Sequence, residues 1–89
     1  MIRRELPVIN KLGLHARAAT KLAAAAGHHQ CRIRTGRDEP LVDAKSIMSL
    51  MLLAASRGTV LIFEFDGEDE DAACEEITAL LADYFGEGE

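Results

Sequence analysis

A histidine and an arginine stand two residues apart in NKLGLHARAATKL, Asn10 to Leu22, where a polar turn gives way to an alanine-rich segment. If a helix begins at Ala16, His15 lies at its amino-terminal end, beside backbone N–H groups that have no partner within the helix. These donors and the positive end of the helix dipole are suited to binding anions. The same field disfavours a charged imidazole, which leaves a ring nitrogen of His15 free to act as a nucleophile.

The chemistry that this arrangement favours is the transient binding of a phosphoryl group. Arg17 can bring a planar guanidinium to an oxyanion held at the amides of Ala16, Arg17 and Ala18. No second histidine, serine or carboxylate nearby completes a hydrolytic triad, and no glycine-rich loop is present for a nucleotide. Phosphoryl transfer needs mainly positioning and charge stabilisation, which a short loop and a helix start can supply. The simpler alternative is that His15 is only a polar cap or a surface residue.

The segments on either side of His15 have the patterns of a strand and a helix. A strand is predicted over Ile2 to Ile9, and Pro7 within it lacks a ladder donor, which favours an edge of the sheet. The apolar residues from Ala16 to Ala26 fall on one face of a helix. Gly27 follows in the position of a carboxyl-terminal cap.

The rest of the chain predicts three strands and two helices. The three strands are a half-buried one over 31–35, a short return strand over 41–44 after a turn over 36–40, and an interior one over 60–65. One helix is predicted over 46–55. The final helix has an apolar face, which consists of Ala73, Ile77, Leu80, Leu81 and Tyr84. Ser46 stands at the amino-terminal cap of its helix. This order predicts an α+β sandwich in one domain, 1–89, with helices on one face of a mainly antiparallel sheet. The final GEGE is expected to fray.

Composition excludes several classes of function. The sequence has no apolar run of 18 residues and no signal-peptide pattern, which predicts a soluble, cytoplasmic protein without a membrane contact. Up to Arg57 there are 10 basic against 4 acidic residues, and from Gly58 onward 11 acidic against none basic. This division predicts salt-sensitive docking to an acidic protein and argues against nucleic-acid binding.

The cysteines and the remaining histidines are expected to have no chemical role. Cys31 and Cys74 fit two buried structural thiols better than a disulfide or a redox pair. The spacing His28-His29-x-Cys31 matches no usual zinc pattern, so no metal site is predicted. His28 and His29 are expected to be solvated residues that follow the first helix.

NKLGLHARAATKL resembles the active-site segment of the histidine-containing phosphocarrier protein family, HPr, whose pattern runs Gly-[Leu/Ile/Met]-His-Ala-Arg-Pro-Ala. A second stretch, DAKSIMSLM, Asp43 to Met51, resembles the family's segment around its regulatory serine. The resemblance implies an open-faced β-sandwich with a four-stranded sheet of order 1-4-2-3 and three helices on one face. It further implies a carrier within a phosphotransferase relay, not a stand-alone enzyme.

In that relay, the resemblance implies that Nδ1 of His15 accepts a phosphoryl group from enzyme I, which phosphoenolpyruvate has charged. Arg17 assists, and an enzyme IIA of a sugar or a regulatory, nitrogen-related system receives the group. Ser46 would be phosphorylated by an ATP-dependent HPr kinase, which is expected to inhibit docking with enzyme I. No cofactor is implied, and the protein is expected to act as a monomer.

The second helix is expected to provide a docking surface for these partners. It is apolar nearly all round, so a one-sided cover over a sheet cannot bury all of it. The residues expected to be exposed for docking are Lys45, Ile47, Met48 and Met51, while Leu50 and Leu53 face the core.

One position departs from the family pattern. Ala18 stands where the family nearly always has proline, which would preset φ in the first turn without loss of a hydrogen bond. Alanine in place of proline is expected to affect the efficiency of phosphoryl transfer more than its chemistry. The alternative from another class is a small interaction domain of ferredoxin-like topology, in which His15 merely caps a helix.

Overall fold

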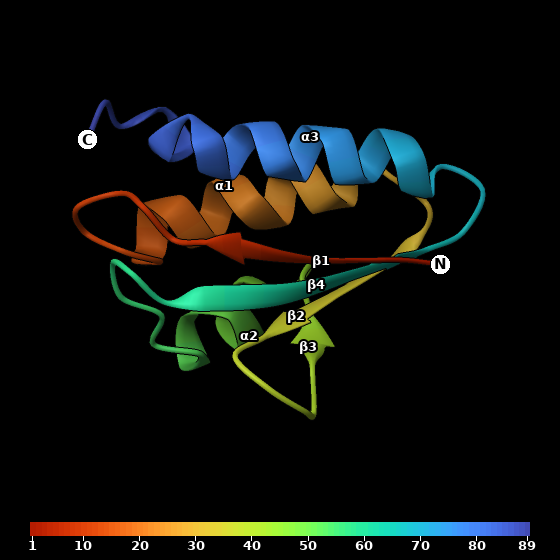
Figure 1. The fold of residues 1–89 in the computed structure, drawn as a ribbon, viewed down its shortest axis with the longest axis horizontal. Coiled ribbons are helices and arrows are strands. Elements are labelled where there is room, and N and C mark those ends of the chain that lie inside the picture. Colours follow the sequence, from red (N-terminus) through yellow and green to blue (C-terminus); the bar gives the residue numbers. More distant parts are fainter.

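The computed structural model describes residues 1–89. Its elements are β1 (Ile2–Pro7), α1 (Ala16–Gly27), β2 (Arg32–Gly36), β3 (Val42–Asp43), α2 (Ile47–Leu52), β4 (Val60–Asp66), α3 (Glu70–Ala82) and the 3-10 turn η1 (Tyr84–Gly86). The strands form one antiparallel sheet in the order β1-β4-β2-β3 (Figure 1). The predicted order of elements and the predicted order of strands are both confirmed.

β1 lies at an edge of the sheet, as Pro7 predicts. It pairs only with β4, and Pro7 lies opposite Val60 at the end of the ladder. Beyond the strand, the amide of Val8 donates to the carbonyl of Thr59 at 2.8 Å, and the amide of Gly58 donates to the carbonyl of Val8 at 2.7 Å. These two bonds hold the start of the loop that leads to His15.

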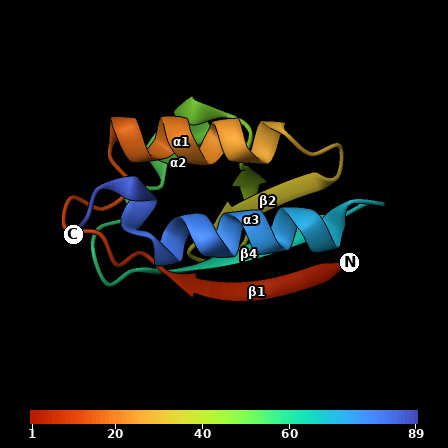
Figure 2. The same cartoon turned by 90° about the horizontal axis from the view of Figure 1, so that it is seen from above.

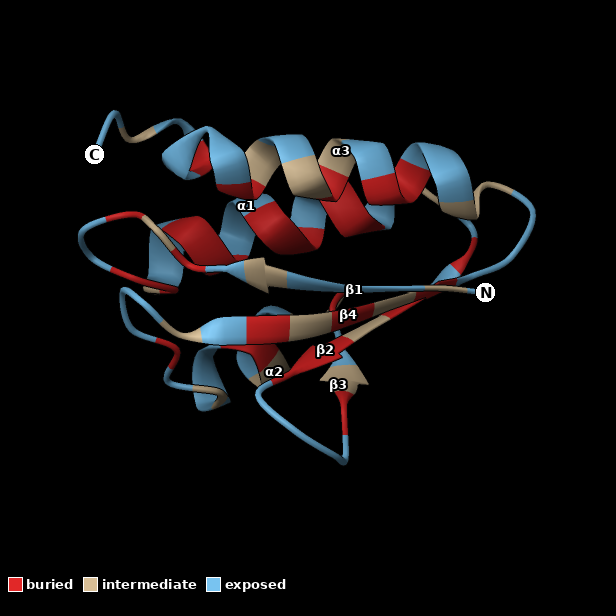
Figure 3. Cartoon of the chain, viewed as in Figure 1, coloured by how far each residue is buried: buried red, intermediate tan, exposed pale blue.

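The core lies between the sheet and the three helices, which cover one face of it. β4 turns Leu61, Phe63 and Phe65 toward this core, and the two phenyl rings stack with their centroids 6.0 Å apart. Figure 2 shows α1 and α3 side by side, running in opposite directions, and Figure 3 shows buried positions gathered between the layers. None of the helices is long and apolar enough to cross a membrane.

The other face of the sheet is open to solvent and carries charged side chains. Glu64 of β4 is paired with Arg3 on one neighbouring strand and with Arg34 on the other, where Nη2 lies 3.1 Å from the carboxylate. Cross-strand pairs of opposite charge stabilise a sheet modestly. The face opposite the helices therefore presents a polar surface.

The first two helices end at other residues than predicted. α1 includes Gly27, and its carboxyl-terminal cap is His28, with φ −70°, so Gly27 is not the cap. α2 ends at Leu52 rather than at Ala55, because Ala54 takes a left-handed φ of 51° that no helix can continue. The predicted cap at Ser46 is confirmed, since its Oγ accepts the amide of Ser49 at 3.2 Å.

The third helix also ends earlier than its apolar pattern predicts. α3 stops at Ala82, and Tyr84 and Phe85 both take positive φ, 56° and 54°. This reversal turns Phe85 into the core, where it is fully buried, and leaves Tyr84 exposed. The prediction of an inward-facing Tyr84 is therefore wrong.

Cys31 and Cys74 are both buried, as predicted, and both are free in the structure. Burial, with a hydrogen bond to Asp69, raises the pKa of the Cys31 thiol to about 11. His29, which the sequence predicts to be solvated, is instead largely covered. Its Nε2 lies 2.6 Å from Glu76, and its Nδ1 lies 3.5 Å from Asp69. Acidic residues at the start and in the middle of α3 thus contact this loop, which is distant in sequence, whereas His28 is exposed as expected.

Candidate functional site

His15 is the residue that immediately precedes α1. Its backbone is extended, with φ −79° and ψ −179°, and its carbonyl accepts the first bond of the helix, from Ala19 at 2.8 Å. The side chain makes no capping hydrogen bond. The interpretation of His15 as a structural cap therefore lacks the bond that would define it.

The start of α1 offers donors that the protein itself does not use. The amides of Ala16, Arg17 and Ala18 donate to no protein acceptor, and the exposed guanidinium of Arg17 forms no ion pair or hydrogen bond. Such free donors at the positive end of a helix are favourable for an anion. The two residues predicted to act on a phosphoryl group thus lie beside unused donors.

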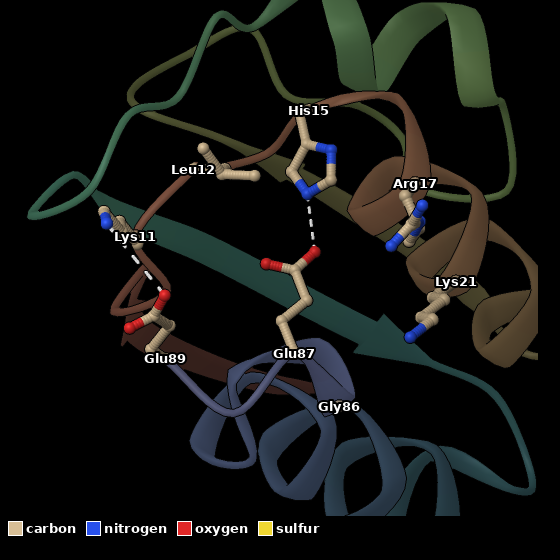
Figure 4. Close-up of a pocket in the computed structure, with 8 residues that line it drawn as sticks. All are labelled: Lys11, Leu12, His15, Arg17, Lys21, Gly86, Glu87 and Glu89. Atoms are coloured by element: carbon tan, nitrogen blue, oxygen red, sulfur yellow. Dashed lines mark hydrogen bonds and ion pairs between the residues drawn. The ribbon is translucent and has the colours of Figure 1, made fainter.

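A pocket of about 500 Å³ surrounds the imidazole (Figure 4). Its lining residues are Lys11, Leu12, His15, Arg17, Lys21, Gly86, Glu87 and Glu89. The structure therefore brings His15 and Arg17 into one pocket, as predicted. Lys21 was missed, although its spacing of four residues from Arg17 places both on one helix face.

Glu87 is the second residue that sequence reasoning missed. One of its carboxylate oxygens lies 2.5 Å from Nε2 of His15, and the other accepts a hydrogen bond from Nδ2 of Asn10 at 2.9 Å. Asn10 is fully buried and also donates to the carbonyl of Gly13 at 2.8 Å. Nothing in the local sequence pattern joins residue 87 to residue 15.

These contacts hold the carboxylate of Glu87 in its charged form. The hydrogen bond from Asn10 is the main cause that holds the pKa of Glu87 below its usual value, and the hydrogen bond from His15 adds to it. Glu87 is therefore ionised at neutral pH. A fixed negative charge lies directly against one edge of the imidazole.

The C-terminal tail, residues 86–89, is held against the His15 loop at further points, so the expectation that it frays is wrong. The amide of Lys11 donates to the carbonyl of Glu89 at 3.0 Å. Nζ of Lys21 donates to the carbonyl of Phe85, just before the tail, at 2.8 Å. The positive φ of Phe85 directs the tail toward the loop. No sequence pattern predicts this turn.

Gly13 fixes the loop from its other side. It has φ 69°, and a Cβ at this position would lie 2.7 Å from the carbonyl of Ala55. The next residue, Leu14, donates its amide to the same carbonyl at 2.8 Å. Only glycine fits so close a backbone contact. The loop that carries His15 is thereby held to the end of the α2 region.

An exposed apolar surface covers α2 and is called the α2 patch below. It consists of Ile47, Met48, Met51 and Leu52. The predicted exposure of the first three is confirmed, and Leu50 is buried as predicted. Leu52 was missed, although 80% of it is exposed. Lys45 is half-buried, because its Nζ donates to the carbonyl of His29 at 2.7 Å.

Comparison with known proteins adds evidence that is independent of this geometry. A family model described as the PTS HPr component phosphorylation site matches residues 2–83. The chain belongs to this HPr family. The HPr of Pseudomonas aeruginosa is 50% identical over 86 residues, 96% of each chain. The HPr of Cupriavidus necator is 48% identical over 89 residues, the whole of both chains.

Comparison with solved structures leads to the same family as comparison of sequences. A crystal structure of HPr from Thermoanaerobacter tengcongensis superposes with a TM-score of 0.93, at 36% identity and over 98% of each chain. The family resemblance and the HPr fold are therefore confirmed. Members of this family are phosphocarriers of the bacterial phosphotransferase system. The roles of individual residues in this chain remain predictions.

Proposed function

We propose that Nδ1 of His15 accepts a phosphoryl group from phosphorylated enzyme I and delivers it to an enzyme IIA of a sugar or a regulatory phosphotransferase system. The observation that carries this proposal is the position of His15 beside three unused amides and an unpaired guanidinium. Family membership supports the same chemistry. We also propose, on the family resemblance alone, that the chain acts in the cytoplasm as a monomer.

In the proposed step, the lone pair of Nδ1 attacks the phosphorus. A phosphorus–nitrogen bond forms while the bond between phosphorus and the donor's atom breaks, and the donor keeps that electron pair. The free amides of Ala16, Arg17 and Ala18 and the guanidinium of Arg17 receive the phosphoryl oxygens, where charge is concentrated. The second transfer reverses these roles toward the acceptor. No cofactor enters either step.

The surface around His15 supports a role in docking with partners in turn. His15 opens into a pocket lined by three basic and two acidic side chains, and Leu12 at its edge is 68% exposed. The α2 patch provides a second exposed apolar surface, with Met48 74% exposed. Exposed apolar side chains with basic side chains beside them are suited to binding an acidic protein surface. We propose that enzyme I and the enzyme IIA use the α2 patch, with Lys45 at its border.

We propose Ser46 as a site of regulatory phosphorylation by an HPr kinase. Its hydroxyl is half-buried at the start of α2 and accepts a hydrogen bond from the amide of Ser49. The oxygens of a phosphate on Ser46 could accept a hydrogen bond from the same amide. A phosphate adds about −2 charge next to Ile47 of the α2 patch. This charge would oppose docking with an acidic partner.

The proposed function is tested by incubating the protein with enzyme I and phosphoenolpyruvate. Phosphate bound to a histidine nitrogen is labile in acid and stable in alkali. Such a label on His15, passed on to an enzyme IIA, is the expected result. A chain in which His15 serves only as a helix cap would take up no label.

A further inference from the structure

We propose that Glu87 is a positioning residue for His15: its carboxylate fixes the imidazole in the tautomer whose Nδ1 carries the lone pair, and balances the charge that the ring gains on phosphorylation. The inference rests on the proposed function of His15. It assigns a role in phosphoryl transfer to a residue of the C-terminal tail.

The contact between the two side chains is short and partly shielded from solvent. Nε2 of His15 lies 2.5 Å from Oε2 of Glu87, and the side chains are only 29% and 12% exposed. Figure 4 shows the carboxylate pointing at one ring nitrogen, while the other nitrogen turns away from it. Glu87 thus occupies the edge of the ring that the phosphoryl group does not use.

Asn10 fixes the orientation of the carboxylate. Its Nδ2 donates to Oε1 of Glu87 and, with its second hydrogen, to the carbonyl of Gly13. A carbonyl can only accept, so the amide of Asn10 must present its NH₂ group to both partners. Because Asn10 is fully buried, it holds Glu87 in place from inside the protein.

The tautomer follows from these partners. An ionised carboxylate only accepts hydrogen bonds, so Nε2 of His15 must carry the proton. In a neutral imidazole the lone pair then lies on Nδ1. When Nδ1 bonds to phosphorus, the proton stays on Nε2 and the ring becomes positively charged. The carboxylate of Glu87 stabilises that charge, as the aspartate does in a Ser-His-Asp triad.

A different effect of the same contact would be inhibition. A negative charge near His15 could repel an incoming phosphoryl group, and the tail would then act as a brake. The position of Glu87 argues for positioning instead, because it contacts the edge of His15 away from Nδ1. Lys21 and Lys11, which line the same pocket, offset its charge toward a phosphoryl group. The two effects predict opposite changes in rate.

The geometry predicts an unusual order of effects among substitutions. In Glu87→Gln, the single side-chain oxygen accepts the bond from Asn10, and the NH₂ group then faces Nε2 of His15. An NH₂ group can only donate, so it selects the opposite tautomer, in which Nδ1 is protonated and cannot attack. Glu87→Ala leaves the ring free to adopt both tautomers. Gln, the closer analogue, should therefore be the more harmful replacement.

Glu75→Gln is the matched control. It removes an exposed carboxylate from α3, and Glu75 neither lines the His15 pocket nor forms a side-chain hydrogen bond or ion pair.

The experiment compares the full chain with Glu87→Gln, Glu87→Ala and Glu75→Gln. Ring ¹⁵N chemical shifts of His15 above pH 8 report the tautomer, and rapid quench with phosphorylated enzyme I gives the transfer rate. We expect Nε2–H in the wild type and in Glu75→Gln, mixed tautomers in Glu87→Ala and Nδ1–H in Glu87→Gln. Transfer should slow about tenfold in Glu87→Ala and about 100-fold in Glu87→Gln.

Unchanged tautomers would overturn the inference, and so would transfer that is equally fast or faster in Glu87→Ala. If the wild type takes up no phosphate at all, the proposed function fails instead. The ¹⁵N shifts would still show in that case whether Glu87 sets the state of the ring.

Discussion

His15 and Glu87 are 72 positions apart in the sequence, yet Nε2 of the one lies 2.5 Å from a carboxylate oxygen of the other. The proposed phosphoryl site is therefore built from two distant parts of the chain. In the proposed transfer, the helix start supplies the nucleophile and the free amides, and the C-terminal tail supplies the group that orients the ring. Asn10 joins the two by donating to both the His15 loop and the tail.

Arg17→Gln should slow phosphoryl transfer without changing stability. Arg17 is exposed and pairs with no protein group, so its removal costs the fold nothing, while the phosphoryl oxygens lose a charged donor. We expect a loss of roughly 10–100-fold in the transfer rate from enzyme I, with an unchanged urea midpoint. Arg57→Gln, another exposed arginine without partners, is the control and should transfer normally. Equal rates in both variants would contradict the role of Arg17.

Ser46→Asp should weaken binding to enzyme I. A negative charge beside the α2 patch opposes an acidic partner, and about fivefold to tenfold weaker binding is expected by titration calorimetry. Ser56→Asp, an exposed serine outside the helices, adds the same charge as a control. In a second assay, HPr kinase and ATP should place an acid-stable phosphate on the wild type and none on Ser46→Ala. Continued labelling of Ser46→Ala would show that another residue is the site.

Ala18→Pro should raise the free energy of unfolding by about 0.4–1 kcal/mol. The amide of Ala18 donates to no protein group, so proline in this first turn removes no hydrogen bond and restricts the unfolded chain. Ala24→Pro, in the exposed middle of α1, should instead cost about 3 kcal/mol. Urea unfolding measures both. Destabilisation by Ala18→Pro would mean that the buried position of Ala18 leaves no room for the ring.

Acid should destabilise the protein partly through Asp69. Hydrogen bonds from the amides of Gln30 and Cys31, at 2.8 and 2.9 Å, hold the pKa of Asp69 below its usual value. Its contribution to stability is complete above the unfolded pKa, near 4, and is lost as the pH falls through the lower folded value. Asp69→Asn should therefore be less stable at pH 7 and lose less between pH 5 and 2. Asp71→Asn, an exposed neighbour, should behave as the wild type in urea melts over this range.

Much of the fold follows from local patterns. Alternation in β2 places Ile33 and Thr35 inside and Arg34 outside, and the period of α1 identifies its buried face. Pro7 indicates the edge strand, because a missing donor is tolerated only there. The position of His15 at a helix start, beside an arginine, also follows from local sequence, and the proposed chemistry rests on it.

The parts that could not be predicted depend on contacts between distant segments. Phe85 is buried and Tyr84 exposed because both take positive φ, which no preference of either residue indicates. That turn sends Glu87 to His15. His29 is covered because α3 brings Asp69 and Glu76 over it. The residue pattern of one helix or strand does not predict such contacts between distant segments.

The most direct test of the account is the phosphorylation of His15 itself. Incubation with enzyme I and labelled phosphoenolpyruvate should place one acid-labile, alkali-stable phosphate on the wild type and on a His28→Ala, His29→Ala double variant. His15→Ala should take up none. Absence of label on the wild type, or label that persists in His15→Ala, would contradict the assignment of His15 as the phosphoryl carrier.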